Sequence, residues 1–173
     1  ALGLLEEDTD SQAWRIHWAA AVALVRAVGH VLYKVDVARY SAKRQVVELK
    51  FRIWKSDNEE HFVFREFIEK ERNSLLKEYH TSVHPISEVG LAFEVKLQPV
   101  QGGPTKTIQD VIFIDENIYR PMIEGAYEGN DARDVLREAI AWWETELKSI
   151  DEEFKRLASD KCSAPPSLMQ RVT

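Results

Sequence analysis

The sequence predicts a mainly α-helical fold, a bundle of four to five helices with a β-hairpin insertion at about residues 88–114. Three observations support this fold class. Apolar residues recur at steps of three and four over residues 11–39 and again over residues 136–157, as in amphipathic helices. Between these stretches, large apolar residues alternate with small or polar ones over residues 91–97, as in a strand with one buried face.

The composition is that of a globular protein with one hydrophobic core. The chain has 173 residues, of which 45% are hydrophobic and 30% are charged. This length suits a single domain, which we expect to span residues 1–173 with loosely ordered ends at 1–10 and 159–173. No apolar run approaches the roughly 20 residues of a membrane span, and no secretory signal is recognisable, so no membrane contact is expected. Cys162 is the single cysteine, which predicts a reducing, cytoplasmic location.

The first helix is predicted over residues 11–39. One apolar stripe on it comprises Trp14, Trp18, Ala21, Val22, Val25, Val28 and Leu32. A second stripe comprises His17, Leu24, Val31 and Val35. Because a helix that is apolar on most sides is usually buried, we expect this helix to lie at the centre of the bundle.

The segment from Ser41 to His84 is predicted to form two helices. At about 1.5 Å per residue, a single straight helix would be roughly 65 Å long, which exceeds a compact domain of this size. The polar stretch KSDNEE provides a break, so the helices are expected at about 42–55 and 57–82. Pro85 follows the second helix and cannot continue it.

The hairpin and the last helix complete the fold. The loop PVQGGPT joins the strand at 91–97 to a partner strand, KTIQDVIFI. A lone hairpin is marginal in water, so we expect it to pack on helices or to join the sheet of another chain. The last helix is predicted to begin near Asn130 or Asp131. Its apolar residues form a heptad seam, which predicts a neighbouring helix either within the chain or in a homodimer: Leu136, Ile140, Trp143, Leu147, Ile150, Phe154 and Leu157.

One candidate site lies in the stretch EKERNSLLKEYH, residues 69–80. At 100° per residue, one polar face of the predicted helix contains Arg65, Glu69, Arg72, Asn73 and His80, with Tyr79 at its edge. An arginine that Glu69 holds in place can bind a phosphate, and a nearby histidine can transfer a proton near neutral pH. The alternative is a row of solvated ion pairs without a function.

A second polar set interrupts the apolar first helix. Arg26 and His30 are one turn apart, and Tyr33 lies on the same side as Arg26. A buried arginine needs a carboxylate partner, which Glu69 or a glutamate of the last helix could supply. Either these residues form a structural network, or the two polar sets face each other across a shared cleft. The five histidines match no metal-ligand spacing, so neither a metal nor a cofactor is predicted.

The pair Arg72-Asn73 followed by His80, on a helix of a mainly α-helical domain, resembles the motif of HEPN ribonucleases (higher eukaryote and prokaryote nucleotide-binding domains). Seven residues separate Arg72 from His80, which is more than in the family pattern. The resemblance implies a helical bundle that forms a dimer and cuts RNA without a metal. It also implies that Arg72 and His80 are the catalytic pair and that Asn73 supports them.

Two hypotheses for the function follow. In the first, the protein binds RNA or a nucleotide, Arg72 holds the scissile phosphate, and His80 assists attack by the ribose 2′-hydroxyl or protonates the leaving oxygen. In the second, the protein is a non-catalytic interaction or scaffold protein that dimerises through its helices or its hairpin. Residues 15–84 carry a net charge of +4 within a chain of net charge −6, which permits an anionic partner.

Overall fold

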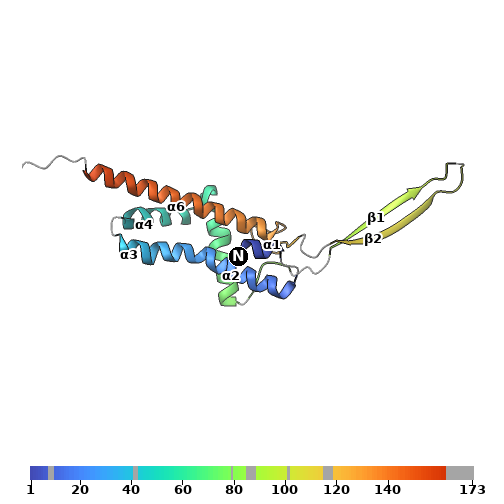
Figure 1. Cartoon of the computed structure of the whole chain (residues 1–173), viewed down its shortest axis with the longest axis horizontal. Helices are drawn as coiled ribbons and strands as arrows, with labels where there is room; N and C mark the ends of the chain where they lie inside the picture. The colour runs from blue at the N-terminus through green and yellow to red at the C-terminus, as the bar shows by residue number, and fades with distance from the viewer. Residues whose placement is uncertain are drawn as a thin grey trace, which may run out of the picture.

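The structure is a computed structural model that describes residues 1–7, 10–40, 43–78, 80–84, 89–100, 102–114 and 119–162. Within these residues, five helical segments form an elongated bundle, and one β-hairpin extends from an end of the bundle (Figure 1). The predicted fold class is therefore confirmed.

The N-terminal part of the chain forms a short helix and a long one. The short helix is α1 (Leu2–Glu7), which lies within the stretch 1–10 that is expected to be loosely ordered. Leu5 is fully buried, and its carbonyl accepts a hydrogen bond from Trp14 Nε1 at 3.1 Å. The long helix consists of α2 (Ser11–Val31), the π-helical turn η1 (Leu32–Asp36) and α3 (Val37–Arg39), as predicted. Asp10 caps it by accepting a hydrogen bond from the Ala13 amide at 2.7 Å.

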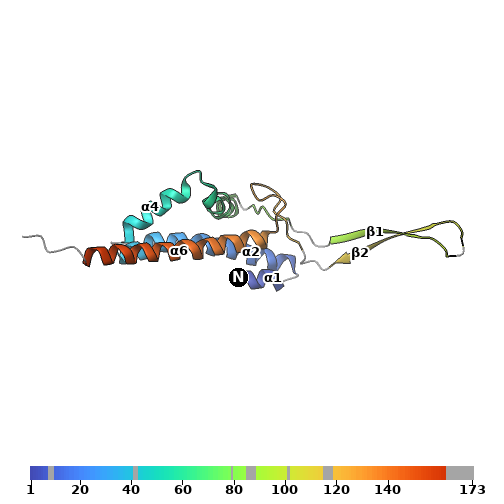
Figure 2. The ribbon, with the colours of Figure 1, turned by 90° about the horizontal axis from the view of Figure 1, so that it is seen from above.

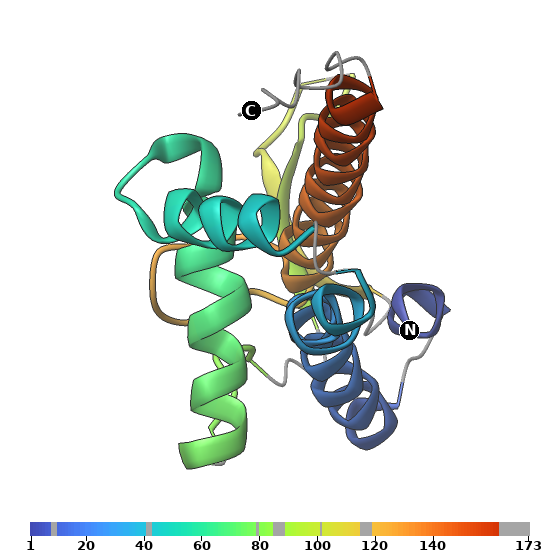
Figure 3. The ribbon, with the colours of Figure 1, turned by 90° about the vertical axis from the view of Figure 1, so that its left-hand side faces the viewer.

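The next two predicted helices are also present, but the second of them contains 3₁₀ and π-helical turns in place of a regular α-helix. Helix α4 spans Lys43–Lys55, and the chain turns at residues 56–58, where the Asn58 side chain accepts a hydrogen bond from the Glu60 amide. The following helix lies across the long axis of the molecule (Figure 3). Its parts are the 3₁₀ turn η2 (Glu59–His61), the π-helical η3 (Phe64–Glu69), α5 (Lys70–Asn73) and the π-helical η4 (Ser74–Glu78).

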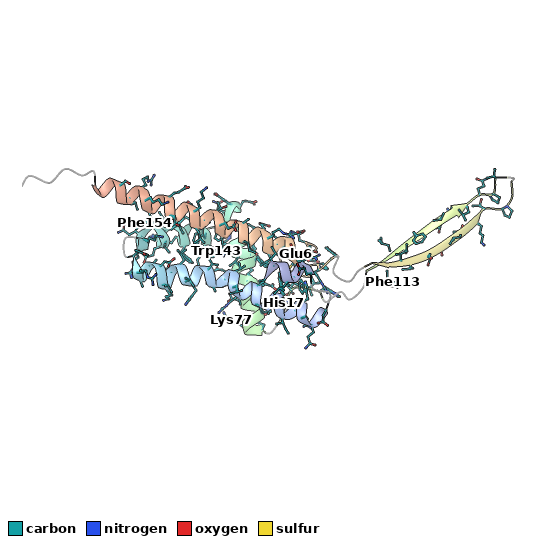
Figure 4. The ribbon with its side chains drawn as sticks, viewed as in Figure 1. Glu6, His17, Lys77, Phe113, Trp143 and Phe154 are labelled. Atoms are coloured by element: carbon teal, nitrogen blue, oxygen red, sulfur yellow. The ribbon has the colours of Figure 1, made fainter. Side chains whose placement is uncertain are left out.

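The hairpin consists of β1 (Val89–Leu97) and β2 (Lys106–Ile114), which pair antiparallel. Gly102 in the connecting loop has φ 77°, a conformation that glycine adopts without strain. The hairpin stands clear of the helices, and Phe113 near its base is far from Trp143 in the bundle (Figure 4). Of the two expected environments, packing on the helices of the same chain is therefore not observed.

The last helix, α6, spans Ala132–Cys162 and continues past the predicted boundary near 159; residues 163–173 lie outside the described residues. Its heptad seam packs within the chain, since Leu136, Trp143 and Ile150 are buried against the other helices. Helix α4 lies on one side of α6 and α2, and α1 lies on the other (Figure 2). Of the two predicted neighbours for this seam, a helix of the same chain or one of a homodimer, the helix of the same chain is observed.

An aromatic cluster joins the helices at the centre of the bundle. Trp54 of α4 contacts Trp142 and Trp143 of α6, with ring centroids 5.2 and 5.4 Å apart, and Phe64 of η3 packs against all three. Gly29 of α2 completes the contact, because a Cβ atom at this position would lie 3.1 Å from the Trp143 ring. The absence of a side chain at Gly29 therefore lets the Trp143 ring of α6 approach α2 closely.

The long helix α2–η1–α3 is only half buried. Its first apolar stripe lies in the core, but Leu24, Val31 and Val35 of the second stripe are 60%, 47% and 47% exposed. The expectation that this helix is buried on most sides is wrong. Residues Gln12–Arg39 are also long and apolar enough to cross a membrane by length and composition, contrary to the expectation that no segment is. Trp14, Trp18 and the rest of the buried stripe give the same residues a place in the core of the bundle.

Candidate functional site

A wide cavity lies between α2–η1 and α4. Its volume is about 770 Å³, in the range of small-molecule sites in proteins. The first half of its lining comes from the long helix and the second half from α4 and the turn after it. The lining residues are Arg26, Gly29, His30, Tyr33, Lys34, Glu48, Phe51, Arg52, Lys55 and Ser56.

The cavity is electropositive. Four of its lining side chains are cations, Arg26, Lys34, Arg52 and Lys55, whereas Glu48 is the one acid among the lining residues. Behind the lining, Glu69 of η3 lies 3.8 Å from Arg26 Nη2 and 3.6 Å from Lys55 Nζ. Glu69 thereby supplies the expected carboxylate partner of Arg26. It also joins α2, α4 and η3 next to the cavity, where one carboxylate faces two cations and neutralises their charge only partly.

Two aromatic rings form an apolar surface beside these charges. The rings of Tyr33 and Phe51 meet edge to face, with centroids 5.6 Å apart. Tyr33 is 41% exposed, and Lys34 Nζ lies 5.5 Å from the centroid of its ring. An exposed ring next to cations can stack with a planar group while the cations hold an anionic group.

A second, smaller cavity adjoins the first. It has a volume of about 380 Å³ and is lined by Ala23, Arg26, Ala27, His30 and Arg72. Arg26 and His30 line both cavities, so the two lie next to each other along α2, and we call them together the cleft. Arg72, from α5, donates a hydrogen bond from Nη1 to Asn73 Oδ1 at 3.0 Å. The two polar sets of the sequence therefore meet at this cleft, through Arg26 and His30 from one set and Arg72 from the other.

His80 lies elsewhere. The helix ends at Glu78, and His80 Nδ1 is 3.4 Å from Glu124 Oε1 in the segment that leads to α6. His80 lines neither part of the cleft. The expected shared face rests on a regular 100° step, but η3 and η4 are π-helical, so each residue in them turns by less and the phase of the helix shifts. In the single chain, the histidine that shares a cavity with Arg72 is His30.

The remaining predicted residues have different surroundings. Arg65 holds the 56–58 turn by donating hydrogen bonds to the Ser56 and Asn58 carbonyls at 2.6 and 2.7 Å, so its contacts are structural. Tyr79 lies outside the described residues. Within the part of the chain that the structure describes, no group of three His, Cys, Asp or Glu side chains is placed to hold a metal ion.

Half of the cleft was missing from the sequence-based site. Glu48, Phe51, Arg52 and Lys55 all lie on α4, which has no spacing motif that links it to Arg26 or His30. The stretch KFRIWK, residues 50–55, mixes three basic residues with two aromatic ones and is the one signal in the sequence that could have indicated it. Only the packing of α4 beside η1 brings this stretch to the cleft.

Comparison of the chain with protein-family models, with curated proteins and with solved structures finds no match. The resemblance to HEPN ribonucleases therefore rests on the Arg72-Asn73 and His80 motif alone.

Proposed function

We propose that the protein binds a phosphate-bearing ligand with a planar base, a nucleotide or a short single strand of RNA, in the cleft between α2–η1 and α4. The observation that carries this proposal is the shared position of Arg26 and His30 between the two cavities, with Arg72 on one side and the exposed Tyr33 ring on the other. Arg26 and Arg72 bind phosphate oxygens, and a base stacks on Tyr33.

The same cleft supports RNA cleavage as a second candidate function. His30 and Arg72 line one cavity, and a metal-independent ribonuclease uses a cation to hold the phosphate and a second group to transfer a proton. Arg72 holds the scissile phosphate, and His30 accepts the proton of the attacking 2′-hydroxyl or protonates the leaving 5′-oxygen. This assignment keeps Arg72 from the resemblance and replaces His80 with His30, because His80 Nδ1 is next to Glu124.

A binding titration in the presence of EDTA tests both functions. A fluorescently labelled single-stranded RNA is titrated with the protein, and its anisotropy and integrity are followed together. We expect binding that weakens as salt rises, because ligand phosphates displace counterions from cationic side chains. Arg72→Ala and Tyr33→Ala should each weaken binding by about tenfold, in line with the loss of one phosphate contact or one stacked base.

Arg44→Ala is the matched control, because Arg44 is an exposed cation on α4 outside the cleft. It should bind RNA as the wild type does. Cleavage that is lost in His30→Ala and kept in His80→Ala would support the assignment of His30, and the reverse result would restore His80 from the resemblance. Equal affinity of the wild type and all cleft variants would overturn the proposed site and favour the interaction protein.

A further inference from the structure

One face of the hairpin carries six exposed apolar side chains, together with Asp110 opposite Phe93 and Lys106 opposite Leu97. In the antiparallel register, Leu91 is opposite Ile112, Val95 is opposite Ile108, and Phe93 and Leu97 lie on the same side as these pairs. All six side chains are between 38% and 56% exposed. We call this set the arm face: Leu91, Phe93, Val95, Leu97, Ile108 and Ile112.

The opposite face of the hairpin is suited to water in its outer half. Glu94 accepts a hydrogen bond from Gln109 Nε2 at 2.9 Å, and its Oε1 lies 3.4 Å from Lys96 Nζ. Thr107 is opposite Lys96 in the register. In the inner half of this opposite face, Val111 and Phe113 are 48% and 67% exposed. A row of exposed apolar side chains on a two-stranded ribbon marks an interaction surface, so we expect a partner to cover the arm face.

A second uncovered apolar surface runs along the long helix. Ile16, Leu24, Val31 and Val35 are 62%, 60%, 47% and 47% exposed. At 100° per residue the first three lie within about 80° of one another around α2, and Val35 follows Val31 by about one turn of the π-helical η1. Ala20 lies between Ile16 and Leu24 on the same side, and its small side chain lets another element approach closely. We call this surface the α2 stripe and define it by Ile16, Leu24, Val31 and Val35.

The arm face and the α2 stripe match in length. Nine residues of a strand at about 3.3 Å per residue extend roughly 30 Å. The α2 stripe covers 20 residues, from Ile16 to Val35, which at about 1.5 Å per residue is also roughly 30 Å. A twisted ribbon packed along a helix is a common layer arrangement in proteins.

From these surfaces we infer that two copies of the chain form a dimer by exchanging arms, so that the arm face of each copy covers the α2 stripe of the other. The arm leaves the bundle at the end where α2 begins (Figure 1). In a two-fold arrangement, the base of each arm therefore lies near Ile16 of the other copy, and its tip lies near Val35. Each interface has an arm from one copy and a helix from the other, and there are two such interfaces.

The buried area favours this arrangement over simpler ones. Ten exposed side chains of roughly 80 Å² each give about 800 Å² per contact, and two contacts give about 1,600 Å², the usual size of a stable interface. If the two arm faces instead stacked on each other, about 1,000 Å² would be buried, which is below that range, and both α2 stripes would stay uncovered. Arm exchange covers both apolar surfaces of both copies.

Sedimentation-velocity and light-scattering measurements on the full chain test the proposal. We expect the mass of a dimer, twice the 20.0 kDa of one chain. Val95→Lys on the arm face and Leu24→Lys on the α2 stripe should each weaken dimerisation on the order of a hundredfold, because each places an unpaired charge in both contacts. Gln109→Lys on the polar face of the arm and Gln45→Lys on the exposed side of α4 are the matched controls and should remain dimeric.

Mixing the two weakened variants distinguishes arm exchange from other dimers. The Leu24→Lys variant keeps an intact arm face, and the Val95→Lys variant keeps an intact α2 stripe. When the two are mixed, these intact surfaces can pack on each other, so one of the two contacts is restored. We expect the mixture to form heterodimers at concentrations at which each variant alone is monomeric. A dimer made of stacked arms or of paired α2 helices would show no such rescue.

A cross-link provides a test that does not depend on weakened variants. In a Cys162→Ser background, Leu97→Cys with Val35→Cys should form an intermolecular disulfide on mild oxidation, whereas Lys96→Cys with Val35→Cys should not, since Lys96 is on the polar face of the arm. A monomeric wild type at micromolar concentration, a Val95→Lys variant that stays dimeric, or a mixture that does not associate would each overturn the proposal.

Discussion

At the scale of single residues, Glu146 is the centre of a buried polar network. It is 6% exposed, and its Oε2 accepts hydrogen bonds from Trp54 Nε1 at 2.9 Å and from Lys50 Nζ at 3.0 Å. His61 Nδ1 lies 3.9 Å from Glu146 Oε1 and accepts a hydrogen bond from Trp142 Nε1 at 3.4 Å. One carboxylate of α6 thus satisfies polar groups that α4 brings into the aromatic cluster.

We predict that Glu146→Ala lowers the free energy of unfolding by about 3 to 5 kcal/mol, because it leaves the largely buried Lys50 ammonium without its charged partner and with the Ser149 hydroxyl as the remaining acceptor. Glu146→Gln should cost less, since its side-chain oxygen can still accept the Trp54 hydrogen bond. Urea denaturation followed by tryptophan fluorescence measures both effects. Glu144→Ala, on the exposed side of the same helix, should change stability by less than about 0.5 kcal/mol; an equally large effect there would contradict this account.

At the scale of secondary-structure elements, the start of α6 depends on Asp131. Its Oδ1 accepts hydrogen bonds from the Arg133 amide and from Arg133 Nε, both at 2.9 Å, and its Oδ2 accepts one from Arg133 Nη2 at 2.7 Å. Burial disfavours the charged carboxylate, but the hydrogen bonds from Arg133 and from the Arg120 amide outweigh it and lower the pKa of Asp131 below its usual 3.8. The cap and the ion pair are therefore formed by the same group.

Asp131→Asn should separate the two contributions. Asparagine still caps the helix, so the variant loses mainly the charge of the carboxylate, and we expect a loss of about 1 to 3 kcal/mol at pH 7. Because the pKa of Asp131 is lower in the folded than in the unfolded chain, its contribution is present above about pH 3.8 and disappears as the pH falls through the folded-state pKa. Thermal unfolding of both proteins between pH 2 and pH 7 measures this. A stability difference that stays constant over that range would contradict the prediction.

At the scale of the whole molecule, the contacts that stabilise the bundle do not include the two strands of the arm. The chain on either side of the arm is tied together at its base, where Val83 pairs with Met122 and the Ile123 amide donates to the Ser82 carbonyl at 2.7 Å. Both Val83 and Met122 are buried in the core. The bundle thus closes across the base of the arm without using the strands themselves.

Replacement of residues 89–114 by a short Gly/Ser linker should therefore leave the bundle folded. We expect the chemical unfolding midpoint of the monomeric bundle to change little, because no buried core residue is removed. Circular dichroism during urea titration measures this, with the monomeric Val95→Lys variant as the reference. Loss of the cooperative transition would show that the arm contributes to the core after all.

Much of the fold could be predicted from the sequence because the information is local. The steps of three and four between Trp14, Trp18 and Val22 determine a helix and its buried side, and the alternation around Phe93 and Val95 determines a strand. These patterns depend only on the geometry of the backbone and the size of neighbouring side chains. The candidate residues Arg26, His30, Tyr33 and Arg72 were also identified in this way.

Only the tertiary structure decided which of these residues meet and which apolar surfaces remain uncovered. The π-helical turns η3 and η4 shift the helical phase, and His80 lies past the end of the helix, so Arg72 shares a cavity with His30. The exposure of Leu24 and Val31, and of the whole arm face, also depends on where distant elements pack. A sequence pattern indicates that a face is apolar. Whether the same chain covers that face depends on contacts between segments that are far apart in the sequence.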